Sequence, residues 1–186
     1  MRRAAPVFLV LTAVLACGRT PGPVEIPPQE LPFSVSRAPS PVETSGPTRA
    51  FTVYFTRDDR LIRAEREIKS DVPSAEAALR ALLQGPTPQE RKQRIATQLP
   101  AAVRLLDLRV DPGTTHVDLS AEFQEPAPSE LIALRVAQVV WTLTEFPEVR
   151  AIRFSIDGEE VAVTTGDGTA TERPVTRADY AALSPA

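Results

Sequence analysis

The most regular hydrophobic pattern in the chain covers residues 129–158 and predicts a helix followed by a strand. In its first half, apolar side chains recur at spacings of three and four, which places them on one face of an α-helix. These side chains are Ile132, Val136, Val139, Val140 and Leu143. Pro147 ends the helix, because a proline cannot continue it. In residues 152–157 apolar and polar side chains alternate, as is typical of a half-buried strand, and Asp157-Gly158 supplies the tight turn that follows.

Two strands and two helices are predicted in residues 51–94. Residues 51–56 are rich in β-branched and aromatic side chains and, with residues 61–68, predict two strands joined by a polar turn. Residues 74–83 predict a helix with one apolar face, which a Gly-Pro pair ends. A short connecting helix is expected to begin at Thr87, where Thr-Pro-Gln-Glu fits a capping box.

A second hairpin is predicted in residues 104–120. The apolar side chains of its two strands alternate with polar ones, so one face of the hairpin is expected to be dry. This face is expected to consist of Leu106, Leu108, Val110, Val117 and Leu119. After the turn at residues 157–158, Val161 and Val163 predict a last short strand.

The order of these elements predicts an α+β fold, because the strands are grouped in hairpins and do not alternate one by one with helices. We expect a compact two-layer domain in which an antiparallel or mixed sheet, built from β-hairpins, packs on two helices. The domain is placed at residues 49–165. Residues 166–186 are expected to be a C-terminal tail whose few core candidates are Val175, Tyr180 and Leu183.

The N-terminus has the composition of an export signal. Residues 1–16 begin with a basic segment and continue with an apolar run too short to span a bilayer comfortably. The sequence Val14-Leu15-Ala16-Cys17 resembles the lipobox of bacterial lipoproteins, with valine where leucine is commoner. This resemblance implies that Cys17 becomes the mature N-terminus, carries fatty acyl chains such as palmitate, and holds the exported chain on the extracytoplasmic face of the cell membrane. The alternative is an ordinary signal peptide with a stray cysteine.

Residues 17–48 differ in composition from the rest of the chain. Eight prolines fall between residues 18 and 48, with glycine, serine, threonine and glutamate between them. Such a segment buries too little apolar surface to offset its conformational entropy, so we expect a disordered tether behind the lipidated N-terminus. With polyproline character it would reach roughly 95 Å at ~3.1 Å per residue.

An ordered series of sequence blocks then carries a resemblance to a known family. The blocks are residues 53–55 (VYF), 79–86 (LRALLQGP), 99–100 (LP), 117–120 (VDLS) with Phe123, 138–147 (QVVWTLTEFP) and 149–158. Together they resemble the GerMN domain of the sporulation and spore-germination family, which is often found on bacterial lipoproteins. The resemblance covers residues 50–163.

The GerMN resemblance implies a compact α+β domain similar to the ring-building motifs of secretion-system proteins, with a core order αββαβ in residues 74–156. It implies no enzyme activity, no cofactor and no catalytic residues. Many members of the family carry a second domain or a tandem copy, whereas this chain has room for one domain. A role that needs the doubled arrangement, or a role in sporulation, therefore does not follow from the resemblance.

The residues themselves offer little chemistry. His116 is the only histidine and Cys17 the only cysteine, so a zinc site of the usual kind lacks ligands. His116, Asp118 and Ser120 contain the residue types of a hydrolase triad. However, neighbours on one face of a strand are ~7 Å apart, too far for the direct hydrogen bonds of a triad. We interpret them as the polar outer face of the hairpin.

Other candidate side chains are interpreted as structural. The clustered carboxylates, Asp118 with Glu122 and Asp157 with Glu159, have the positions of turn or edge residues. Trp141 is interpreted as an aromatic residue at the edge of the core, although it is the best single candidate for an exposed interface anchor. The net charge of −3 and the pI of about 5.3 do not favour nucleic-acid binding.

We therefore expect a non-enzymatic, membrane-anchored extracytoplasmic lipoprotein whose domain assembles with itself or with another envelope protein. The expected contacts are a sheet edge, a polar sheet face or the long helix. One alternative is a module that binds an envelope ligand in an apolar pocket. The other is a cell-wall hydrolase, which a deep cleft lined by acidic groups from different strands would favour.

Overall fold

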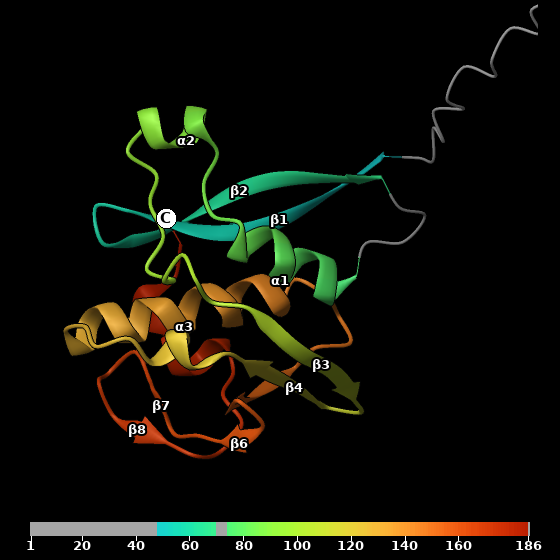
Figure 1. Cartoon of the computed structure of the whole chain (residues 1–186), viewed down its shortest axis with the longest axis vertical. Helices are drawn as coiled ribbons and strands as arrows, with labels where there is room; N and C mark the ends of the chain where they lie inside the picture. Colours follow the sequence, from blue (N-terminus) through green and yellow to red (C-terminus); the bar gives the residue numbers. More distant parts are fainter. Residues whose placement is uncertain (1–47, 70–73, 186) are drawn as a thin grey trace, which may run out of the picture. The chain divides into compact units, whose positions relative to one another are not determined.

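The structure, a computed structural model, describes residues 48–69 and 74–185 (Figure 1). The predicted signal peptide, Cys17 and the predicted tether up to residue 47 lie outside the described residues, whereas Thr48, placed in the tether, begins β1. The elements are β1 (Thr48–Arg57), β2 (Arg60–Lys69), α1 (Ala75–Leu83), α2 (Pro88–Lys92), β3 (Leu105–Asp111), β4 (Thr114–Leu119), η1 (Ala121–Gln124), α3 (Ser129–Leu143), β5 (Ala151–Ile156), β6 (Glu159–Glu160), β7 (Val163–Thr164), β8 (Ala170–Thr171) and η2 (Arg177–Leu183). No helix in residues 48–69 or 74–185 combines the length and the apolar character that crossing a bilayer requires.

The first two strands form a long antiparallel hairpin. Its register runs from Thr48 opposite Lys69 to Arg57 opposite Arg60. The turn residues between the strands, at positions 58 and 59, are both aspartates with φ of 50° and 56°, the left-handed conformation that a two-residue hairpin turn requires. Phe51, Val53, Tyr54 and Phe55 of β1 are buried and form part of the core.

The second sheet has four strands in the order β3-β4-β5-β6. β3 and β4 form an antiparallel hairpin, whereas β4 and β5 pair in parallel and are connected through α3. The inward side chains of β4 and β5 alternate with more exposed ones and are fully or nearly fully buried. The α+β class and the mixed character of the sheet are therefore confirmed, although the β4–β5 pair is not a hairpin.

The expected dry face of the β3–β4 hairpin is only partly formed. Leu106 and Val110 are 45% and 41% exposed, while Val117 and Leu119 are completely buried. The register between β3 and β4 shifts between Leu105 and residue 107, so that Leu105, and not Leu106, lies opposite Leu119. A bulge of this kind adds one residue to the strand and breaks the alternation on which the prediction rests. Because β3 is also an edge strand, its side chains lack neighbours on one side.

α3 is buried on nearly all sides, which its apolar stripe does not predict. Every residue from position 133 to position 140 is buried. The helix contacts β1, α1, β7 and η2, and Figure 1 shows it between the β1–β2 hairpin and the C-terminal segment. A helix surrounded in this way needs partners for its inward polar side chains.

The polar side chains of α3 find these partners on the outer edge of β1 and in the segments around Gln98 and Phe123. The Gln138 side-chain amide donates to the carbonyl of Tyr54 at 2.9 Å and accepts from the N–H of Gln98 at 2.7 Å. The Thr142 hydroxyl accepts from the N–H of Tyr54 at 3.0 Å. Buried Arg135 donates to three backbone carbonyls, among them that of Phe123 at 2.7 Å. α3 therefore satisfies backbone groups that no neighbouring strand pairs with.

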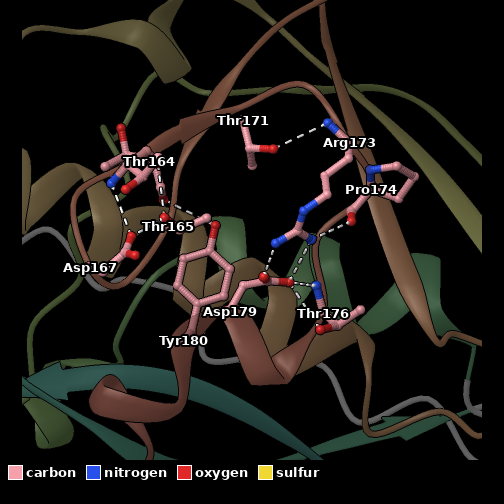
Figure 2. A network of polar contacts seen from close by, with 10 residues as sticks. Thr164, Thr165, Asp167, Thr171, Arg173, Pro174, Thr176, Asp179 and Tyr180 are labelled. Carbon is pink, nitrogen blue, oxygen red and sulfur yellow. Dashed lines mark hydrogen bonds and ion pairs between the residues drawn. The ribbon is translucent and has the colours of Figure 1, made fainter.

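The C-terminal segment packs on the domain, although a tail is expected there. Val175 and Tyr180 are completely buried. Val175 exchanges two backbone hydrogen bonds of 2.8 Å with Ile152 of β5, and the Tyr180 hydroxyl donates to the Thr164 carbonyl at 3.0 Å. Figure 2 shows the polar network that surrounds Tyr180. These residues complete the core beside β5 and α3.

Asp179 holds this segment together by its carboxylate (Figure 2). The carboxylate accepts hydrogen bonds from Arg173 and from the backbone N–H of Thr176, the latter at 2.7 Å. The hydrogen bond from Arg173, although opposed by burial, lowers the pKa of Asp179 from an ordinary value of 3.8 to about 2. A carboxylate whose pKa falls on folding stabilises the fold above its unfolded pKa, and this stabilisation is lost as the pH falls through the folded pKa.

We therefore expect Asp179→Asn to destabilise the chain by about 1–2 kcal/mol at pH 7, after allowance for screening of the exposed Arg173. The difference from the parent chain should shrink as the pH falls from about 4 to about 2. Thermal unfolding at several pH values measures this difference. A difference that stays constant over that interval would show that Asp179 acts only through packing.

Candidate interaction surface

The three triad-type residues of β4 do not come together. His116 Nε2 lies 3.5 Å from a carboxylate oxygen of Asp111. Asp118 accepts from the N–H of Gly158 at 3.0 Å, and the Ser120 hydroxyl accepts from the N–H of Arg104 at 3.0 Å. Ser120 is buried, whereas His116 and Asp118 are half-buried. Each of the three side chains serves a different local contact, so they form no nucleophile and base pair.

The clustered carboxylates are also separated by their elements. Asp118 belongs to β4 and Glu122 to η1, while Asp157 occupies a turn with φ of 49° and Glu159 begins β6. No hydrogen bond joins the members of either pair in the described residues. In residues 48–69 and 74–185 no group of three His, Cys, Asp or Glu side chains has a geometry suited to a metal ion.

One hollow does collect carboxylates from different segments. It has a volume of about 610 Å³ and lies beside the first turn of α3, with Asp59, Glu130 and Asp167 in its lining. All three residues are exposed. Hydrogen bonds from Thr165 and the backbone of Thr169 lower the pKa of Asp167. A general acid needs a raised pKa, so Asp167 does not suit that role.

Trp141 lies at the edge of the core, as the sequence indicates, but its ring is covered. The ring centroid is 5.6 Å from that of Tyr54, and the guanidinium of Arg177 lies 4.5 Å from the indole ring. Arg177 also donates to Glu145 at 2.6 Å, and the Tyr54 hydroxyl donates to the same carboxylate oxygen at 2.7 Å. The indole is therefore not a free interface anchor.

The contacts among Tyr54, Glu145 and Arg177 also shift the pKa values of Tyr54 and Glu145. Burial, followed by the hydrogen bond to Glu145, raises the pKa of Tyr54 to about 12. Burial alone would raise the pKa of Glu145, but the hydrogen bonds from Tyr54 and Arg177 lower it. Glu145 is therefore held ionised and Tyr54 neutral at physiological pH, which suits a fixed structural contact.

A largely apolar groove lies at the C-terminal end of α1. It has a volume of about 530 Å³ and is lined by residues 83–86 and by the segment from Ile95 to Leu99. Arg91 and Arg94 stand at its border, and the Arg91 guanidinium donates to the carbonyl of Pro86. The groove is thus a concave, largely apolar feature of the described domain with two basic groups beside it.

The free edge of β3 carries the exposed large hydrophobic side chains of the described residues, Leu106 and Val110. Between them on the strand lie Asp107 and Arg109, both exposed. Arg109 Nε is 3.1 Å from a carboxylate oxygen of Asp111, an exposed pair of little energetic weight. The edge thus combines apolar and oppositely charged side chains with strand backbone that no other described strand pairs with.

Comparison with known proteins identifies the domain that carries this edge. The model of the Germane family, described as sporulation and spore germination, matches residues 52–162. The chain belongs to the Germane family. The match lies within the span of residues 50–163 expected from the GerMN resemblance, which is confirmed. None of the curated proteins compared with this Germane chain matches it.

Solved structures show the same fold. The Germane chain is similar to the tandem GerMN domains of the sporulation protein GerM from Bacillus subtilis, with 22% identity, a TM-score of 0.57, and coverage of 71% of this chain and 47% of that one. The chain thus spans about half the length of that tandem protein. For the first GerMN domain of the same protein, the identity is 23% and the TM-score 0.52, with coverage of 70% and 99%.

The sequence pattern did not predict two features of this Germane domain, the bulge in β3 and the inward polar side chains of α3. It gave no signal for the bulge in β3, because the alternation of Leu106, Leu108 and Val110 is that of an unbroken strand. It also gave no sign that Gln138 and Arg135 point inward. Their spacing of three residues, repeated approximately by Thr142, is the one pattern that could have indicated a second inward face of the helix.

Proposed function

We propose that this protein is a lipid-anchored extracytoplasmic protein whose Germane domain binds another protein of the cell envelope and catalyses no reaction. The observation that carries the proposal is the edge of β3, where Leu106 and Val110 are exposed beside unpaired backbone. His116, Asp118 and Ser120, which have the residue types of a catalytic triad, each make a separate contact with a neighbouring turn or backbone group. Membership in a family described as sporulation and spore germination supports a role in such a process without specifying it.

The experiment that tests this proposal is site-specific photocrosslinking in intact cells. A photoreactive amino acid at Leu106 should give a discrete protein adduct, because this side chain is exposed on the proposed edge. The matched control places the same amino acid at Glu172, which is exposed on the C-terminal segment. Equal, diffuse labelling at both positions, with no discrete adduct at residue 106, would contradict binding at the β3 edge.

The anchor is tested separately by Cys17→Ala. Without the thiol no acyl chain can be attached, so we expect either an unprocessed precursor or a released soluble form. Fractionation of cells and immunoblotting measure both outcomes, and Ser34→Ala in the same N-terminal region serves as a control that leaves the thiol intact. If Cys17→Ala remains in the membrane fraction and is processed normally, the protein is not a lipoprotein.

A second candidate function is the binding of a small envelope ligand. The groove beside Arg91 and Arg94 favours this alternative, because its lining is apolar and two guanidinium groups stand at its border. An apolar ligand that carries an anionic group would fit this chemistry. Arg94→Ala would then weaken ligand binding while leaving the crosslinks at Leu106 unchanged, which separates the two functions.

A further inference from the structure

The free strand edges of the domain differ in how they are protected. The outer edge of β1 is covered, because Tyr54 is bonded by α3 and Thr56 exchanges two backbone hydrogen bonds with Ala96. The outer edge of β5 is covered by Val175, Val161 and β6. β2 has a free edge of predominantly charged sequence, which opposes pairing with another strand.

β3 is less protected, because no other described segment covers its outer edge and its only interruptions are the bulge at residue 106 and three charged residues. It is the terminal strand of the four-stranded sheet, and its seven residues pair only with β4 among the described segments. Leu106 and Val110 lie exposed on it, and neither a proline nor a lysine interrupts residues 105–111. A long edge of this composition is a template for the addition of one more strand.

We propose that the strand added to β3 is β3 of a second copy of this chain, running antiparallel about a two-fold axis at Leu108. This inference rests on the proposed function, because it names the partner of the same edge. In this register Asp107 of one copy lies opposite Arg109 of the other, and the same pair recurs by symmetry. Leu106 lies at the bulge between Leu105 and Asp107, so the regular part of this contact runs over residues 107–109, with Val110 beside it.

The charges select this register over its neighbours. An axis at Asp107 or at Arg109 sets like charges directly opposite each other, which is unfavourable in an antiparallel pair. If the two-fold axis lies between two residues, the apolar side chains of the two copies lie on opposite faces of the joined sheet. Parallel pairing in register sets Asp107 opposite Asp107 of the second copy. Of these arrangements, the axis at Leu108 is the one in which Asp107 and Arg109 of each copy face the opposite charge, and both residues lie outside the bulge at residue 106.

The small size of the β3–β3 contact indicates a dimer of low affinity. A pair of seven-residue strands buries less surface than a stable complex needs, so the dimer belongs to the weak and transient class. Chains held on one membrane surface meet at a higher effective concentration than chains in solution, which favours the same contact in the cell. We therefore expect association that depends strongly on concentration.

Charge exchange across the axis tests the proposal with the full-length chain purified in detergent. By symmetry, Asp107→Arg places arginine opposite arginine twice, and Arg109→Asp places aspartate opposite aspartate twice. Each single variant should weaken the dimer at least about tenfold in sedimentation equilibrium. The double variant Asp107→Arg with Arg109→Asp restores opposite charges in both pairs and should return the affinity to within about threefold of the parent chain.

The outcomes separate this inference from the proposed function. Dimerisation unchanged in both single variants overturns pairing through β3, and so does a double variant as weak as the single ones. A parent chain that stays monomeric in detergent and gives a discrete adduct with a different protein at Leu106 also overturns self-pairing, while the proposed function stands. Thermal unfolding of each variant controls for folding, since the substituted side chains are exposed and unfolding temperatures should stay within a few degrees of the parent.

Discussion

Replacing Val140 by aspartate should unfold the domain. Val140 is completely buried in the middle of α3, a helix that touches β1, α1 and the C-terminal segment. A carboxylate at this position has no cationic partner and loses its hydration, which costs about 4 kcal/mol or more. Because single domains are stable by about 5–15 kcal/mol, this substitution removes most or all of the stability. Circular dichroism during thermal unfolding measures the loss.

Two matched variants separate the buried charge from other effects. Val140→Ala leaves a cavity without a charge and should cost about 2–3 kcal/mol. Val110→Asp makes the same chemical change at an exposed valine of β3 and should cost less than about 1 kcal/mol. A Val140→Asp chain that unfolds at the same temperature as the Val110→Asp chain would mean that α3 is not enclosed as the structure shows.

A chain that ends at Thr165 should lose cooperative unfolding. The boundary at residue 165 is the one that the hydrophobic pattern suggests, yet Val175 and Tyr180 beyond it are completely buried. Their removal exposes the surfaces of β5 and α3 that they cover and breaks two backbone hydrogen bonds to Ile152. The loss of a buried aromatic side chain alone costs about 3–5 kcal/mol. Differential scanning calorimetry should show a broad transition or none.

The control for this truncation removes only residues 184–186. Ser184 is exposed and follows the last turn of η2, so the shortened chain should unfold at nearly the same temperature as the full chain. If the chain that ends at Thr165 also unfolds in one sharp transition at that temperature, the C-terminal segment contributes no core. Tyr180→Phe tests the hydrogen bond to Thr164 apart from the packing and should cost about 1 kcal/mol.

Local sequence signals predicted the elements well. Ser74 caps α1 by accepting from the N–H of Ala77, and Thr87 with Glu90 forms the expected capping box of α2. These signals involve residues three positions apart, so the sequence contains everything needed to recognise them. The aspartates of the β1–β2 turn and Asp157-Gly158 are also local signals, because each turn is recognisable from its own residues. The long helix was predicted from its apolar spacing for the same reason.

Features that depend on distant partners were not predictable. The parallel pairing of β4 with β5 joins residues 114–119 to residues 151–156, and no local pattern distinguishes it from a hairpin. Gln138 is polar in sequence but buried in the structure, because it bonds Tyr54, 84 positions away. Val175 has too few apolar neighbours in sequence to indicate its place beside Ile152. At the β3 edge, the sequence pattern indicated that Leu106 and Val110 belong to a strand, but it did not predict that they are exposed.

The contacts of Tyr54 also determine how the domain resists a mechanical load. A pull applied through the chain that precedes Thr48 enters at the open end of the β1–β2 hairpin, where Thr48 lies opposite Lys69. There the ladder can open one pair at a time. At Tyr54 the load meets hydrogen bonds to Gln138 and Thr142, and two residues later the bridge from Thr56 to Ala96. Further extension then requires β1 to separate from α3, so we expect the hairpin to open from Thr48 to Tyr54 before the contacts with α3 break.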